Sequence, residues 1–425
     1  MHMRNVGSDA PAERLQGSDI PLALAFVCTE ATFLALFVVT LLRTPAEAML
    51  KRFIGVLMLI ILTYAMERAI VPICTTRSRP HWAVTAASLL WVQMFSASEI
   101  VLISRVSAAQ LYGGTMVEIG HVRSAISLLW NMRRIGTRWQ VKNVPSIKGL
   151  AKQSRAGFIA RRLATTILAY LFVDFIASLP PPEPALVQPD KAALFPPDGL
   201  GIDDIVFRTV MTFSYFLTTA ILNLFMTNMG AIFAVLSGLS RPTDCPPLYG
   251  SFSDAFTIRR FWGQVTLSFF TRFCSGTNVI CRISWHQMFR IFLTGHANLV
   301  VDTFLPFLRG TIVARYTRQT IAFLISGLIH YRAEQLMGVP HIENGALQFF
   351  LLHSAAIMLE DAVQPFLARL VPAPLGRVLG YAWVAFIFVW SAPPWTYPGV
   401  RLGIDTGALL PVRVLGPYVK NYLEV

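Results

Sequence analysis

Long apolar runs recur along this chain, and they restrict its fold more than any other feature. Runs of the roughly 20 residues that a helix needs to cross a bilayer lie near 19–42, 53–74, 82–104, 158–179, 206–239, 311–330, 347–370 and 376–395. Hydrophobic residues make up 54% of the chain and charged residues 14%, whereas ordinary soluble domains have roughly 25% charged residues. We therefore predict an all-α fold, a polytopic transmembrane helical bundle of about 8 to 10 spans.

The runs follow one another closely enough to belong to one membrane domain. We expect residues 1–18 to form a polar lumenal tail and residues 19–425 a single domain. The first run is too long for the core of a signal peptide, so we interpret it as the first span. The run 206–239 is longer than one crossing needs, and an alternative is two short spans divided near Gly230.

The charges on the loops predict the orientation of the chain. The loop at about 119–160 has many arginines and lysines but no acidic residue, and such loops stay in the cytosol. The next loop, 180–204, is rich in proline and acidic residues, so we place it in the lumen. The net charge of +13 is spread over loops and forms no continuous basic face. It therefore indicates membrane topology, and we expect no nucleic-acid partner.

The cysteines and histidines give no support for a metal site. The chain has an odd set of five cysteines without a CxxC spacing, which indicates neither a disulfide framework nor a thiolate metal site. No two histidines stand three or four residues apart on a predicted helix. We predict no metal.

The segment "FLISGLIHYRAE" places His330 at the edge of an apolar run. A polar side chain there is costly, so its default interpretation is a functional site. Glu334 lies four positions later, on the same face of a helix, where it could orient His330. A second histidine, His286 in "SWHQMFR", lies between Trp285 and Gln287. Taken alone, that triplet is also typical of ordinary residues at a membrane interface.

Three motifs occur in a fixed order: "RRFWG" (Arg259–Gly263), "WHQ" (Trp285–Gln287) and "SGLIH" (Ser326–His330). Together with "NMRRIGTRWQVKNVP" (Asn131–Pro145), they make the chain resemble the wax-synthase-like branch of the membrane-bound O-acyltransferases. It is most similar to the fungal acetyltransferases of terpenoid and meroterpenoid secondary metabolism. The resemblance covers roughly residues 120–395. It implies transfer of an acetyl group from acetyl-CoA to a lipophilic alcohol by a multi-pass protein of the endoplasmic reticulum.

The resemblance also assigns roles to the two histidines. His330 matches the position of the family's catalytic base. His286 matches the position of the second polar residue of the site, where plant wax synthases have asparagine. The chemistry of imidazole agrees, since its ordinary pKa of about 6.5 suits a general base near neutral pH. Partial burial disfavours imidazolium and keeps His330 able to accept a proton. His286, Trp285 and Gln287, in that order, are candidates to stabilise the negative charge that develops on the thioester oxygen.

The basic segments are candidates for binding the phosphates of coenzyme A, because arginine pairs with phosphate in a bidentate manner. Our candidates are Arg133, Arg134, Arg138 and Lys142, followed by Arg259 and Arg260. The alternative is that these charges only keep the loop in the cytosol and contact anionic lipid. We expect acetyl-CoA to act as a co-substrate, with no bound cofactor.

Two other functions are compatible with parts of the sequence. One is a long-chain acyl-CoA wax or sterol O-acyltransferase of the same superfamily. The other is a multi-pass transporter of lipophilic substrates, in which intramembrane acidic residues and histidines would relay protons. Such transporters often contain internal repeats, and none is visible in this sequence.

Residues 265–281 separate the FWG and WHQ motifs, which lie close together in the family that this chain resembles. We hypothesise that this segment is a retained intron, because a valine codon begins with GT and a Cys-Arg pair can encode an AG acceptor. The alternative is a genuine insert that loops out of the domain. Sequencing the transcript tests the hypothesis, and a mature message that contains these codons would refute it.

Overall fold

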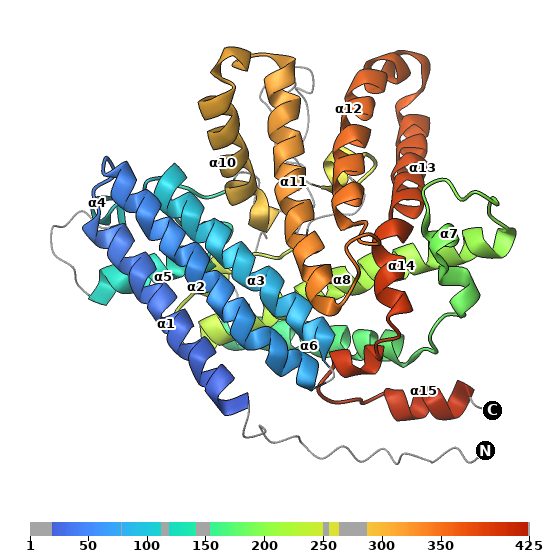
Figure 1. The fold of residues 1–425 in the computed structure, drawn as a ribbon, viewed down its shortest axis with the longest axis horizontal. Coiled ribbons are helices and arrows are strands. Elements are labelled where there is room, and N and C mark those ends of the chain that lie inside the picture. The colour runs from blue at the N-terminus through green and yellow to red at the C-terminus, as the bar shows by residue number, and fades with distance from the viewer. Residues whose placement is uncertain are drawn as a thin grey trace.

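The computed structural model describes residues 19–77, 79–111, 119–141, 154–249, 255–262 and 287–423. Within these ranges every regular element is a helix (Figure 1). The long helices are α1 (Asp19–Arg43), α2 (Met49–Thr76), α3 (Pro80–Ser98, continued by a π-helical turn at Glu99–Ile103), α6 (Arg155–Ser178), α8 (Ile202–Leu236), α10 (Gln287–Phe304), α11 (Ile312–Met337), α12 (Ala346–Leu370) and α13 (Ala373–Ser391). The short ones are α4 (Ala108–Leu111), α5 (Ile119–Trp130), α7 (Pro189–Ala192), α9 (Ile258–Phe261), α14 (Pro393–Arg401) and α15 (Gly416–Leu423).

Seven of the described helices are long and apolar enough to cross a membrane: α1, α2, α3, α6, α8, α12 and α13. They coincide with seven of the predicted runs and confirm a polytopic helical membrane protein. The eighth run, 311–330, is the helix α11, whose arginines and Glu334 make it less apolar than the other seven. The segment 265–281 lies outside the described residues.

The run 206–239 forms one helix and not two. Helix α8 continues without a break for 35 residues through Gly230, since a single glycine costs a helix only about 1 kcal/mol. At 1.5 Å per residue the helix is about 52 Å long. This exceeds the roughly 30 Å of hydrocarbon in a bilayer, so α8 must tilt or extend beyond the membrane.

The described helices pack around two large hydrophobic cores and two smaller clusters. Helices α1, α2 and α3 lie side by side and, with α5, enclose the first core. Helices α9, α11, α12, α13 and α14 contribute the second core. Helix α11 contacts both α3 and α12, so it joins the two halves (Figure 1).

An ion pair fixes α11 against α2. Arg332 pairs with Glu67, and the Trp91 indole donates a hydrogen bond of 2.8 Å to the same carboxylate. The Glu67 side chain is only 1% exposed. The Arg332 side chain is 37% exposed, so solvent screens the pair in part, but the contact still joins α2 to the end of α11 that carries the SGLIH motif.

Polar contacts show which loops share a side of the bundle. Arg133 donates to the carbonyl oxygens of Pro246 and Pro247, both at 2.8 Å, so the segment after α8 returns to the basic loop. Arg401 donates to the Val187 carbonyl at 2.8 Å and pairs with Glu343. The turn between α11 and α12 therefore lies beside the acidic loop. Both placements agree with a single crossing by α8.

Candidate active site

His330 points into the protein and not toward lipid. Its ring stacks on Phe350 of α12, with 5.0 Å between ring centroids and 12° between ring planes. Trp395 of α14 lies edge-on to the same ring at 5.1 Å. Within the described part of the chain, no group hydrogen-bonds to the imidazole.

Gly327 in the SGLIH motif allows this arrangement. A Cβ at this position would lie 2.9 Å from Leu347 Cδ1 and 3.3 Å from Phe350 Cβ. Because residues three apart share a helix face, the glycine and His330 face the same neighbour, α12. The missing side chain lets α12 approach closely enough for Phe350 to stack on the imidazole.

Glu334 is held by Trp395 and not by His330. The Trp395 indole Nε1–H donates to Glu334 Oε1 at 3.3 Å, and Tyr215 of α8 packs on the indole at 5.6 Å. Trp395 thus contacts both His330 and Glu334 of α11. Its role was not predicted from the sequence, because an aromatic residue beside an apolar run resembles any other core residue. The sequence Pro-Pro-Trp at the start of α14 indicates only that a helix could begin there.

The RRFWG motif is anchored to two adjacent carboxylates of α12. Glu360 accepts hydrogen bonds from the backbone N–H groups of Ile258 and Arg259, which caps the first turn of α9. Arg259 pairs with Asp361, a carboxylate that also pairs with Arg315 at 3.0 Å. Neither carboxylate was predicted from the sequence. Their shared role is to hold the motif against α12.

Phe350 connects the RRFWG and SGLIH motifs directly. Its ring centroid lies 5.6 Å from that of Trp262 and 5.0 Å from that of His330. Motifs that are remote in sequence are thereby brought to one aromatic cluster. Trp285 and His286 lie outside the described residues, and Gln287 is described only as the first residue of α10.

Trp262 also belongs to a buried chain of hydrogen bonds. Its indole donates to His353 Nδ1 at 2.9 Å, and His353 Nε2 contacts Ser391 Oγ at 3.1 Å. Because the indole can only donate, Nδ1 is the acceptor and Nε2 carries the proton of the neutral ring. Ser391 in turn donates to the Ile387 carbonyl. His353 therefore has both ring nitrogens occupied, in contrast to His330.

We expect Trp262→Phe to lower the stability of the protein by about 1 to 3 kcal/mol, because His353 Nδ1 would lose its donor in a buried place. The thermal unfolding of detergent-purified protein measures this. Trp82→Phe is the matched control, since it removes an indole hydrogen bond of 3.0 Å at an exposed position. Equal unfolding temperatures for the two variants would contradict the prediction.

Of the arginines predicted to bind phosphate, Arg133 and Arg134 bind partners within the protein, whereas Arg138 and Arg260 lie over aromatic rings. The Arg133 guanidinium donates hydrogen bonds to two backbone carbonyl oxygens. Arg134 is buried and forms an ion pair of 2.9 Å with Glu99. Burial, together with the nearby Arg162, lowers the pKa of Arg133 to about 10, so it remains charged at neutral pH. Arg138 lies over the Trp139 ring at 4.5 Å. Arg260 lies over Phe256 at 4.1 Å, and Lys142 is outside the described residues.

Metal ligands do not gather in the part of the chain that the structure describes. No group of three or more histidine, cysteine or acidic side chains there could hold a metal ion. At the aromatic cluster, the imidazole of His330 is a side chain that can accept a proton from a substrate.

Comparison with known proteins shows which family this chain is similar to. The model of the membrane bound O-acyl transferase family matches residues 282–352, which include His330, Phe350 and the whole SGLIH motif. Over these residues the chain is similar to the membrane bound O-acyl transferase family. It is an O-acyltransferase, as the resemblance predicted, and a multi-pass membrane protein.

The relatives of this O-acyltransferase are fungal acetyltransferases. The acetyltransferase eriL of Hericium erinaceus is 29% identical over 80% of this chain and 84% of its own length. For ataH of Aspergillus terreus the identity is 29% over 70% and 96%, and for atnC of Arthrinium sp 29% over 65% and 62%. The chain thus spans less than two thirds of atnC. No solved structure matches it.

Proposed function

We propose that this O-acyltransferase moves an acetyl group from acetyl-CoA to a hydroxyl of a terpenoid or meroterpenoid secondary-metabolite alcohol, in the membrane of the endoplasmic reticulum. Acetyl as the transferred group is supported by the names of the relatives, all acetyltransferases. The class of the acceptor is supported by the resemblance of the motifs. The observation that carries the proposal is the imidazole of His330, which stands inside the aromatic cluster without a described hydrogen-bond partner.

His330 acts as the general base in the proposed reaction. One ring nitrogen takes the hydroxyl proton while the alcohol oxygen attacks the carbonyl carbon of the thioester. The tetrahedral intermediate then expels the CoA sulfur, which takes the proton from the imidazolium, so that ester and free CoA leave. The step needs no acyl-enzyme. Holding both reactants together supplies much of the rate, because well-oriented groups reach effective molarities of about 10⁵ M or more.

The residues around His330 define its position in this mechanism. Phe350 and Trp395 restrict the ring by contact on a face and an edge. Glu334 acts on it only through Trp395, so we propose that it is a positioning residue. For the thioester oxygen we propose His286, supported by Trp285 and Gln287, as the family motif implies.

For coenzyme A we propose a binding site on the side of the bundle where the basic loop lies. Arg138 and Arg260 rest on aromatic rings, and a guanidinium stacked in this way directs its N–H groups outward in its own plane, the geometry that suits phosphate. Lys142 is the remaining candidate, whereas Arg259 already pairs with Asp361 and holds the RRFWG motif against α12. Arg133 and Arg134 already donate to internal partners, and we assign them to holding the loop in place.

The test is an assay of membranes that contain the full chain. They are given radiolabelled acetyl-CoA and a panel of terpenoid alcohols, and ester formation is measured. Labelled acetyl ester is the expected product. Ester that forms only from long-chain acyl-CoA would refute acetyl transfer and favour a wax or sterol O-acyltransferase.

A further inference from the structure

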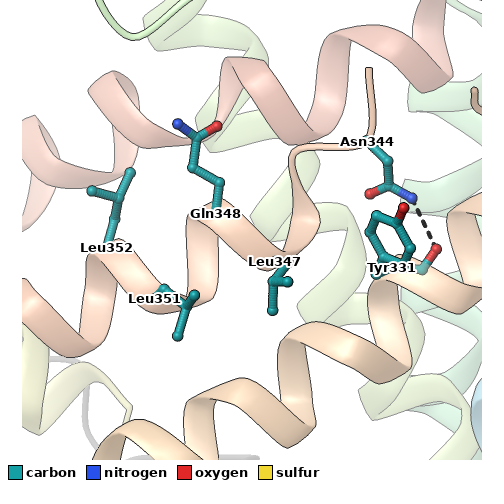
Figure 2. Close-up of a pocket in the computed structure, with 6 residues that line it drawn as sticks. All are labelled: Tyr331, Asn344, Leu347, Gln348, Leu351 and Leu352. Atoms are coloured by element: carbon teal, nitrogen blue, oxygen red, sulfur yellow. Dashed lines mark hydrogen bonds between the residues drawn. The ribbon is translucent and has the colours of Figure 1, made fainter. Parts of the chain in front are cut away.

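A pocket lies beside the SGLIH motif, on the hairpin formed by α11 and α12 (Figure 2). It has a volume of about 550 Å³, which falls in the range of about 300 to 1,000 Å³ of small-molecule sites. Figure 2 shows Tyr331 and Asn344 at one end and Leu351 and Leu352 at the other. The remaining lining residues are Leu347 and Gln348.

The residues that line the pocket are close neighbours of His330 in α11 and α12. Tyr331 directly follows His330 in α11, and Leu347 packs on Gly327, one turn before it. Phe350 is one turn after Leu347 on the same face of α12, and it stacks on the imidazole. Leu347 thus lines the pocket, and its neighbour Phe350 contacts the His330 ring.

The lining selects for an uncharged, largely apolar molecule that carries oxygen. Three leucines offer aliphatic surface, and no charged side chain lines the pocket. The Asn344 amide is occupied, since it donates to the Tyr331 carbonyl at 2.8 Å and accepts from the Ala346 N–H. Within the described residues the Gln348 amide has no hydrogen-bond partner. It is thus the group available to a hydroxyl, ketone or ester oxygen.

The pocket lies at the end of the bundle opposite to the basic loop. The turn that contributes Asn344 is tied to the acidic loop through Arg401, Glu343 and the Val187 carbonyl. The triphosphorylated end of coenzyme A suits the basic side, and an uncharged lipophilic alcohol suits this one. We propose that the pocket binds the apolar body of the acceptor alcohol, which extends past Leu347 so that its hydroxyl reaches His330 from the side opposite to acetyl-CoA. This inference rests on the proposed function.

The test substitutes Gln348, which is exposed and can be changed without altering the core. Gln348→Trp fills the pocket, and Gln348→Leu removes only the amide. Gln364→Trp is the matched control, because it makes the same exchange at an exposed position of α12 more than four turns away. Steady-state kinetics in membranes, with a terpenoid alcohol that the unmodified protein esterifies, give KM for the alcohol and for acetyl-CoA.

We expect Gln348→Trp to raise the KM for the alcohol at least tenfold and Gln348→Leu to raise it several-fold, with the KM for acetyl-CoA unchanged. Gln364→Trp should match the unmodified protein. An unchanged KM for the alcohol in Gln348→Trp would overturn the pocket assignment, and so would an equal rise in both constants. Either of the two contradicting results would leave the proposed function standing, provided that His330→Ala is inactive. If the unmodified protein formed no ester at all, the proposed function itself would be wrong.

Discussion

His330→Ala should reduce ester formation by a factor of about 10² to 10⁴, the usual contribution of a general base. The alcohol would then have to attack the thioester without losing its proton to the enzyme. The nearby Glu334 carboxylate accepts a hydrogen bond from Trp395, and we do not expect it to take the place of the imidazole as the base. The measurement is the rate of labelled ester formation in membranes, normalised to the amount of inserted protein.

Alanine at this position also removes packing, so a second variant is needed to separate the two effects. His330→Phe keeps a ring that can stack on Phe350 and contact Trp395, but it has no basic nitrogen. It should unfold at a temperature close to that of the unmodified protein and be as inactive as His330→Ala. If His330→Phe retained more than a tenth of the activity, His330 would be a packing residue and the proposed mechanism would be wrong.

The fold was largely predictable because spans are encoded locally. Each apolar run must satisfy its own backbone hydrogen bonds in lipid, so a long run becomes a helix almost regardless of its neighbours. Helix α8 shows where local encoding stops being decisive. Its length suggested an alternative of two spans, but a long helix can tilt, and Gly230 alone does not break it.

The surroundings of the candidate site were less predictable, because they depend on contacts between distant segments. His330 stands out in the sequence as a polar residue in an apolar run. Phe350 and Trp395 do not, since aromatic residues are common in such runs, and their role appears only when α12 and α14 pack against α11. Charge is equally ambiguous. The sequence shows that Arg133 is cationic, but only the structure shows that its guanidinium donates hydrogen bonds to backbone carbonyl oxygens.

The contact between α12 and α14 is the element that places Trp395, and a single methyl group tests it. Gly345 directly precedes α12, and a Cβ there would overlap the carbonyl oxygen of Pro394 and lie 2.5 Å from its carbonyl carbon. These are backbone atoms, which cannot rotate away as the tip of a side chain can. The backbone dihedral φ of Gly345 is −86°, a value that alanine also adopts, so the conflict is purely one of space.

Gly345→Ala should therefore lower stability by about 1 to 3 kcal/mol, as overpacking does, and reduce ester formation further than that loss of folded protein explains. The reason is that α14 must move away from α12 and would take Trp395 away from both His330 and Glu334. Thermal unfolding and the rate per folded molecule measure the two effects separately. Gly376→Ala is the control, because a Cβ there meets nothing within 4 Å and alanine favours a helix over glycine by about 1 kcal/mol. If Gly345→Ala behaved like Gly376→Ala in both measurements, close packing of α14 on α12 would not be what holds Trp395 against His330.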